Sequence, residues 1–377
     1  MSIPVKFIDS ASATPGTPVL TGQVGSLIAL LDALLINGFG SVTLSSLVVA
    51  GGVATATAAA HGFPVNSVLL LAGATPSGLN GEKRAATTTS GTFTFDATGI
   101  ADGTATGTIT AKMAPAGWAK VFSGTNKAAY QALAGNRHFL RVVNDATIAA
   151  NKAIARGFES MSDVDTGTNA FPTTVQQADA TCLWKTSTTA DATARPWRFY
   201  ADDRMLYLCV KYNASYYNEI YSFGEIAQSF KVGDAYHTMI TINTDTTSLS
   251  ASNALVSFIA SSLYVARSYS QIAGSVTGSG TYTPSGNNYS GGTGNLAFPN
   301  PADAGLYIAP AYLYGAASNG LRGVMAGLYQ CWQNGPSTDG TIINNVTNMS
   351  GRNVLVQWTQ YSSSQAVVAF DITGPWR

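Results

Sequence analysis

The acidic residues that have an acidic neighbour are the first places where this chain could do chemistry. Asp163 and Asp165 lie two positions apart in the segment SDVDTGTN. In a loop, two such carboxylates could hold a calcium ion, but a calcium loop needs further acidic ligands and a terminal Glu, which this segment lacks. We therefore expect Asp163 and Asp165 to lie in a solvated turn.

A second acidic pair, Asp202 and Asp203, could supply one half of the carboxylate pair of a glycosidase. Both residues fall between two strand-like segments, 197–200 and 205–211, so the pattern predicts that they lie at the tip of a hairpin. A general acid needs a raised pKa, which requires burial, whereas a hairpin tip is solvated. We therefore expect no acid catalyst at this turn.

Other residues of catalytic type are scattered. Glu219 and Glu225 lie among aromatic residues in NEIYSFGEI, which could indicate a sugar-binding cleft or ordinary packing. The histidines lie in separate segments, at His61, His138 and His237. His61 precedes Gly62 and is expected to be a turn residue rather than a ligand. No nucleophile elbow, phosphate loop, HExxH or CxxC motif occurs. The sequence thus predicts no catalytic, cofactor-binding or metal-binding residues, no cofactor, and a protein that is not an enzyme.

Cysteine usage gives no sign of a crosslinked or metal-bound fold. The chain has three cysteines, far apart in the sequence, at Cys182, Cys209 and Cys331. A disulfide framework needs a denser and even set, and a zinc site needs close pairs. We expect all three to be buried small hydrophobic residues.

One compact apolar run stands out in a chain that otherwise reads as strands and turns. In VGSLIALLDALLI, residues 24–36, apolar side chains recur at helical spacing, at Val24, Leu27, Ile28, Leu31, Leu34 and Leu35. Asn37-Gly38 then gives a helix stop. The pattern predicts an amphipathic helix of about four turns. Its apolar face either docks the subunit onto other chains, which makes these residues the candidate assembly site, or covers the chain's own β core.

The same run is neither a membrane span nor a secretory signal by its sequence. A span needs about 20 apolar residues. A signal peptide needs a basic start and a small-residue cleavage site. Only Lys6 is positively charged before the run, and Asp32 lies within it. We therefore expect no secretory signal and a protein that folds in a cytoplasm.

Residues 41–112 are predicted to form a small β-barrel-like module or sandwich, after an N-terminal arm and docking helix at residues 1–40. The strand-like runs of the module are 53–58, 67–72, 92–95 and 105–111. Turn pairs such as Asn80-Gly81 and Asp102-Gly103 separate them. Turn-rich joints flank the module on both sides, so we interpret it as an insertion whose removal leaves a body that still folds.

Residues 113–377 are predicted to form the body, a larger β-sandwich with short helices. The segments 126–133 and 146–156 are compatible with helix. Beyond the hairpin around Asp202, the candidate strands are 238–242, 255–259, 305–313, 353–358 and 366–372. Residues 274–295, rich in Gly, Ser, Thr and Asn, are predicted to be a long surface loop. The predicted fold class is therefore mainly β.

Charge is scarce in this sequence. Charged residues make up 11% of the 377 residues, and 20 basic residues balance 20 acidic ones. A typical soluble domain has about 25% charged residues. No Lys/Arg cluster that could bind phosphates is present, which makes nucleic acid a poor partner. Few charges suit surfaces that are buried against neighbouring subunits, because each missing charge avoids a desolvation cost.

Several segments resemble virion proteins of tailed bacteriophages. IPVKFIDSASATPGTPVLTGQVGSLIALLDALLINGFG looks like the start of such proteins, and AAAHGF, AGATPSGLNG and ADGTATGTITAK are similar to a small β domain of phage tail proteins. GWAKVFSGTNKAAYQ, GNRHFLRVVNDAT, RGFESMSDVDTGTNAFPT and ARPWRFYADDRMLYLCV extend the resemblance over residues 1–212. The resemblance implies a non-enzymatic structural subunit of the virion tail (tip, baseplate or collar), assembled in the bacterial host cytoplasm. Its partners would be its own copies, docked through residues 1–40, and other virion proteins.

Two other functions stay open. A capsid decoration protein would have the same sequence texture. A host-glycan-binding receptor protein, such as a tailspike, would use aromatic faces to stack on sugar rings. Candidates for those faces, which could equally pack in a core or an interface, are Tyr216, Tyr217, Tyr221 and Trp332. Host glycan is the partner in that case, although no motif indicates it.

Overall fold

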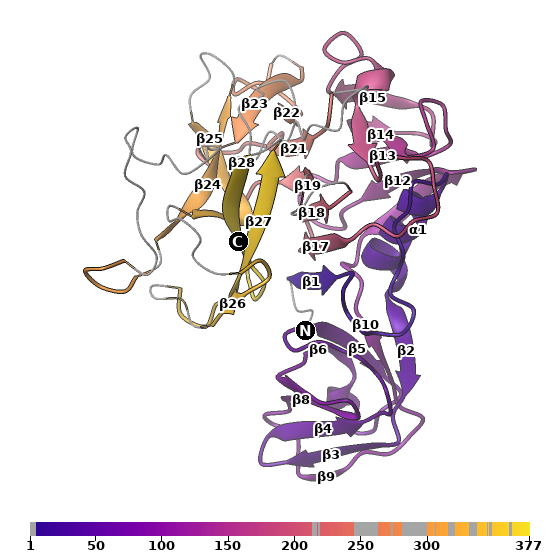
Figure 1. Cartoon of the computed structure of the whole chain (residues 1–377), viewed down its shortest axis with the longest axis vertical. Coiled ribbons are helices and arrows are strands. Elements are labelled where there is room, and N and C mark those ends of the chain that lie inside the picture. Colours follow the sequence, from indigo (N-terminus) through magenta and orange to yellow (C-terminus); the bar gives the residue numbers. More distant parts are fainter. Residues whose placement is uncertain are drawn as a thin grey trace.

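Antiparallel strands dominate the structure, a computed structural model that describes part of the chain (Figure 1). The described residues are 5–212, 217, 219–244, 263–272, 274–280, 300–305, 307–315, 321–331, 338–344, 346, 349–361 and 364–377. Their strands form four sheets, and all the ladders between named strands are antiparallel. The predicted mainly β fold class is confirmed.

Two sheets make up the small module in the lower part of Figure 1. The first has the order β2 (Phe39–Thr43), β10 (Thr110–Met113), β5 (Val68–Ala72) and β6 (Gly81–Arg84). The second has the order β7 (Thr87–Thr88), β8 (Thr92–Asp96), β4 (Val53–Thr57), β3 (Ser46–Ala50) and β9 (Gly103–Thr104). Burial alternates along β8, which sends Phe93 and Phe95 into the shared core. The module is thus a sandwich of two sheets, and the strand predicted at 105–111 begins only at Thr110.

A six-stranded sheet follows the module in the chain. Its strands are β11 (Ala119–Gly124), β12 (Lys127–Gln131), β13 (Phe139–Val143), β14 (Lys152–Met161), β15 (Gly167–Phe171) and β16 (Leu183–Lys185). The segments 126–133 and 146–156 therefore supply strands, and the expectation that they are helical is wrong. β12 lies between β11 and β13, with Ala128 opposite Val142. Pairing on both sides outweighs the weak helix propensity of this segment.

The largest sheet has 13 strands and joins the first described residues to the last. Its order is β1 (Lys6–Asp9), β17 (Trp197–Ala201), β18 (Met205–Val210), β19 (Glu219–Glu225), β21 (Thr238–Thr241), β22 (Leu263–Val265), β23 (Val276–Gly280), β24 (Ile308–Gly315), β25 (Leu321–Cys331), β28 (Ser364–Asp371), β27 (Val354–Tyr361) and β26 (Ile342–Ile343), with β20 (Gln228–Ser229) paired to β25. The predicted hairpin of β17 and β18 is confirmed. The strand predicted at 255–259 lies outside the described residues, as do residues 281–295 of the predicted loop, whose earlier part contains β23.

The predicted N-terminal helix is confirmed as α1 (Ser26–Leu31) followed by a π-helical segment, Asp32–Asn37. It stops at Gly38, which has a left-handed φ of 66°. A β-carbon at Gly38 would lie 2.2 Å from the Met113 carbonyl oxygen, so only glycine fits there. Short 3₁₀ turns occur at Ser77–Leu79 and Asp179–Thr181. Among the described residues, no helix is both long and apolar enough to cross a membrane.

Two large hydrophobic clusters lie on opposite faces of the 13-stranded sheet. In β17, Trp197 and Phe199 belong to the first cluster, which also contains residues of the helix, the module and the six-stranded sheet. Tyr200 belongs to the second cluster, together with Phe370 and Trp376. The Tyr200 and Phe370 rings stack with centroids 4.0 Å apart. The division of the chain at residues 40 and 112 stays a prediction.

Candidate functional site

The N-terminal arm, residues 5–25, lies along the edge of the 13-stranded sheet of its own chain. After β1, the Ser10 N–H donates to the Trp197 carbonyl at 2.9 Å, and the Trp197 N–H donates to Ser10 Oγ at 2.8 Å. Farther along, the Arg195 N–H donates to the Leu20 carbonyl at 2.8 Å. The arm is therefore attached to the body by a strand and by separate hydrogen bonds at both of its ends.

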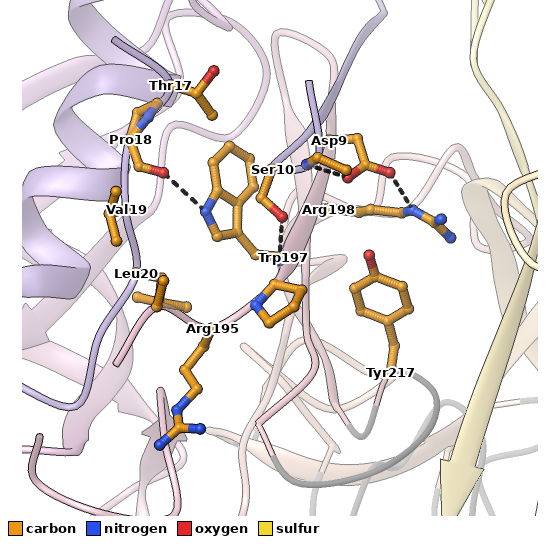
Figure 2. Close-up of a pocket in the computed structure, with 13 residues that line it drawn as sticks. Asp9, Ser10, Thr17, Pro18, Val19, Leu20, Arg195, Trp197, Arg198 and Tyr217 are labelled. Carbon is orange, nitrogen blue, oxygen red and sulfur yellow. Dashed lines mark hydrogen bonds and ion pairs between the residues drawn. The ribbon is translucent and has the colours of Figure 1, made fainter. Parts of the chain in front are cut away.

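Between those two attachment points the surface is hollowed by a groove of about 330 Å³ (Figure 2). We call it the arm groove; its lining residues are Asp9, Ser10, Ala11, Thr17, Pro18, Val19, Leu20, Ala194, Arg195, Pro196, Trp197, Arg198 and Tyr217. Trp197 is fully buried, and its indole N–H donates to the Pro18 carbonyl at 3.2 Å. Val19, in contrast, is 59% exposed. The accessible part of the groove is thus mainly aliphatic.

Charged residues beside the arm groove are fixed by ion pairs. Arg198 is buried and donates to Asp9 at 2.7 Å and to Asp339 at 2.8 Å. Its guanidinium carbon lies 4.7 Å from the centroid of the Tyr217 ring. Burial raises the pKa of the Tyr217 phenol, so this side chain stays neutral. Arg195 pairs with Asp191 at 3.3 Å.

The chemistry that this groove can perform is binding. Of its hydroxyl groups, Ser10 Oγ accepts the Trp197 N–H and Thr17 Oγ1 donates to the Thr14 carbonyl, and no histidine is among the lining residues. An aliphatic groove with fixed, paired charges can hold an apolar side chain of a protein partner. We therefore take the arm groove as the candidate docking site.

The predicted assembly residues of the helix lie mostly inside the chain. Buried within its own core are Leu27, Ile28, Leu31, Leu34 and Leu35. Val24 is 40% exposed at the start of the helix. The polar side of the helix is fixed as well, because Asp32 accepts from Tyr130 at 2.8 Å and from Lys120 at 2.8 Å. The helix thus covers the chain's own β core, and its docking to other chains stays a prediction.

The turn at Asp202 differs from the expectation of a solvated hairpin tip, which is wrong for this residue. Asp202 is buried, accepts the Met205 N–H at 2.7 Å and pairs with Arg377. Burial raises the pKa of Asp202, although Arg377 acts in the opposite direction. Asp203 is exposed. The two carboxylates therefore face different surroundings and form no catalytic pair.

Asp163 and Asp165 do lie in an exposed turn, as predicted. Asp163 accepts the Asp165 and Thr166 N–H groups at 2.7 and 2.8 Å. Asp165 pairs with Arg141 at 2.5 Å and with Lys127 at 3.1 Å. Within the described part of the chain, no group of three or more acidic, histidine or cysteine residues could hold a metal ion.

Glu219 and Glu225 lie in β19, which is buried along its whole length, so the interpretation as a sugar cleft is wrong. Glu225 accepts the Asn136 N–H and lies 3.4 Å from Nε2 of His237. Burial favours the neutral acid, but hydrogen bonds from His237 and the Asn136 backbone outweigh it and lower the pKa of Glu225. Glu219 accepts from the Tyr212 hydroxyl at 3.1 Å.

The remaining candidates are packing residues. His61 is buried, and its Nδ1 accepts the Phe63 N–H at 2.9 Å. Tyr221 is buried, and its hydroxyl accepts the Lys185 N–H at 2.6 Å. Of the other proposed aromatic faces, Tyr217 lines the arm groove, and Tyr216 and Trp332 lie outside the described residues. The cysteines are free and buried, as predicted, at Cys182, Cys209 and Cys331.

Sequence reasoning missed the arm groove because two distant segments build it. The signals in the sequence are weak: Pro18-Val19 on the arm and Pro196-Trp197 at the start of β17 are apolar pairs that include proline. Proline removes a backbone donor, so each pair marks a place where regular pairing stops. Neither pair alone indicates a partner.

Comparisons with known proteins leave the family of the chain open. No protein-family model matches it. No curated protein matches it either. Among solved structures it is similar to the "Phage phi92 endosialidase", with 9% sequence identity and a TM-score of 0.18. The match covers 89% of this chain and 52% of that chain, so this chain spans about half of its length. At that TM-score the similarity carries no conclusion about fold or function.

Proposed function

We propose that this protein is a non-enzymatic structural subunit of a tailed-phage virion, placed in the tail at the tip, baseplate or collar and assembled in the bacterial host cytoplasm. The observation that carries the proposal is the resemblance of the segments in residues 1–212 to phage virion proteins. The low charge content supports it, because subunits that bury much of their surface avoid desolvating charges.

The described acidic residues support a non-enzymatic role. Asp202 pairs with Arg377, and Asp165 pairs with Arg141 and Lys127. Glu225 accepts the Asn136 N–H and lies 3.4 Å from Nε2 of His237. Each of these carboxylates is held by a structural contact, which is the ordinary use of such groups. The arm groove adds a surface that suits protein docking.

The proposal is tested on purified phage particles. An antibody raised against the chain should label intact virions at the tail by electron microscopy, and the protein should appear in the particle proteome. Absence from particles that were purified from a lysate containing the free protein would reject the proposal. Label on the capsid surface would instead favour a decoration protein.

A glycan-binding receptor protein is the second candidate, because Tyr217, one of the aromatic residues that could stack on sugar rings, is among the lining residues of the arm groove. Its ring is buried and faces the Arg198 guanidinium, so a sugar would have to displace that contact. In that case a column of immobilised host envelope glycans should retain the parent chain, and it should not retain the Tyr217→Ala variant. A structural subunit should pass through without retention and should release no sugar.

A further inference from the structure

Two neighbouring surface turns present bare apolar side chains. Val232 is 98% exposed and Ile272 is 90% exposed. The side chain of Gln271 joins the turns, because its Nε2 donates to the Gly233 carbonyl at 3.3 Å and to Asp234 Oδ1 at 3.0 Å. We call residues 230–234 and 268–272 the double turn. Two apolar side chains exposed on joined turns offer a surface that a partner protein can bury.

The double turn is held rigidly from beneath. Asp234 is buried and accepts two hydrogen bonds from Arg322, at 2.8 and 3.0 Å. Ser229 Oγ donates to the same carboxylate at 2.8 Å. Burial favours the neutral form of Asp234, but hydrogen bonds from Arg322 and Ser229 outweigh it and lower the pKa of this carboxyl, so the carboxylate stays charged. A contact built on fixed turns loses little conformational entropy on binding.

Charge at the double turn is complementary to charge at the arm groove. Arg322 pairs with Asp234, and Arg267 pairs with Glu159. Lys231, whose ammonium lies 5.3 Å from the centroid of the Tyr269 ring, has no carboxylate partner among the residues that the structure describes. The double turn therefore carries one positive charge in excess.

The ion-paired groups at and beside the arm groove have the opposite excess. Arg195, Arg198 and Asp9 line the groove, and Asp191 and Asp339 pair with the two arginines from beside it, which makes three carboxylates against two guanidinium groups. The exposed apolar residues of the groove are Ala11, Val19, Ala194 and Pro196. One surface of the chain thus offers projecting apolar side chains and a cation, and another offers an aliphatic hollow and an anion.

We propose that Val232 and Ile272 of one copy insert into the arm groove of a second copy. This inference rests on the proposed function, since it names a contact through which the subunit would assemble. The two surfaces differ and are separated in the sheet, because the groove adjoins β1 and β17 whereas the double turn flanks β21 and β22 (Figure 1). The contact is therefore head-to-tail, and repetition closes a ring or extends a filament.

The test uses two variants of the full chain and light scattering. The double variant Val232→Asp/Ile272→Asp keeps the groove, and Val19→Asp keeps the double turn. The parent chain should form an oligomer, and each variant should fall to the mass of one chain. Mixed together, the two variants should form a 1:1 heterodimer and nothing larger, because only one intact contact is left. Val175→Asp, at another residue that is 95% exposed, is the matched control and should keep the parent mass.

Three outcomes would overturn the inference: a parent chain that stays monomeric at high concentration, variants that keep the oligomer, or variants that do not associate when mixed. All variants should keep the circular dichroism spectrum of the parent chain, because every substituted side chain is largely exposed, so misfolding is separable from lost contact. Antibody labelling of particles is independent of this result. A labelled virion with a monomeric chain rejects only the head-to-tail contact, whereas an oligomeric chain that is absent from virions rejects the proposed function.

Discussion

Asp202 and Asp163 both accept N–H groups of their own turns, yet they differ in their surroundings. Asp202 is buried against Arg377, and Asp163 is exposed. Removing one partner of a buried pair typically costs about 3–5 kcal/mol, so Asp202→Ala should lower the free energy of unfolding by about 3 kcal/mol. Asp163→Ala should cost clearly less, because water replaces its contacts. Urea unfolding at pH 7 measures both, and equal losses would contradict the assignment.

His138 makes stability depend on pH. Its Nδ1 is 2.8 Å from the Thr238 hydroxyl, and burial lowers its pKa from the usual 6.5 to about 4. The titratable groups around it are Glu159, Glu225, His237 and Arg267. Between pH 6.5 and about 4, His138 therefore binds a proton in the unfolded chain but not in the folded chain.

This difference predicts a loss of stability on acidification. At pH 7 the residue has no effect, and the free energy of unfolding should fall by up to about 3 kcal/mol as the pH drops to 4. His138→Gln removes the titrating group, so its stability should fall less over the same range. Unfolding curves at pH 7, 5.5 and 4 measure the slope. A slope unchanged by the substitution would show that the pKa of His138 is the same in the folded and the unfolded chain.

At the scale of elements, the helix carries both buried and exposed apolar residues. Leu31 is fully buried, whereas Val24 is 40% exposed. Leu→Ala in a core costs about 2–5 kcal/mol, so Leu31→Ala should destabilise the chain by about 3 kcal/mol. Val24→Ala should change stability by less than about 0.5 kcal/mol. Thermal unfolding compares the two variants, and similar losses would contradict the burial of the apolar face.

Arg84 ties the module to both ends of the body. Its guanidinium donates four hydrogen bonds of 2.9–3.2 Å to carbonyl oxygens, those of Val5, Asn66, Ile372 and Thr373. Hydrogen bonds to a charged group contribute about 1.5–3 kcal/mol each, so Arg84→Ala should cost at least about 2 kcal/mol. Amide exchange should quicken at residues 5–9 and 372–374 and stay unchanged in β13. The neighbouring Lys83→Ala is the control, since Lys83 donates only to the exposed turn at Gly78.

Local sequence patterns predicted the elements whose signals are local. The alternation in β8, the hairpin of β17 and β18, and the helix stop at Gly38 were all readable. The strands β12 and β14 could not be predicted locally, because these segments become strands by pairing with β13, and the local sequence does not reveal that pairing. The arm groove could not be predicted for the same reason, because segments that are distant in the sequence, within residues 9–20 and 194–198, line it together with Tyr217.

At the scale of the whole molecule, the N-terminal arm cannot be tested by deletion alone. Residues 1–40 include β1, which is an edge of the 13-stranded sheet, and the whole helix that covers the core. Loss of assembly after such a deletion would follow from misfolding as readily as from lost docking. Substitutions at the exposed Val19 and Val24 leave the core intact and separate the two effects.

The predicted insertion of the module can be tested by excision, because the two ends of the module lie side by side. β2 and β10 are neighbours, with Phe39 opposite Met113, so a short Gly/Ser linker can replace residues 41–111. We expect a soluble body that unfolds cooperatively, with a lower midpoint because the hydrogen bonds from Arg84 are lost. Circular dichroism and urea unfolding measure this. The first hydrophobic cluster contains both Phe93 of the module and Phe199 of the body, so an insoluble product would mean that the two share one indispensable core.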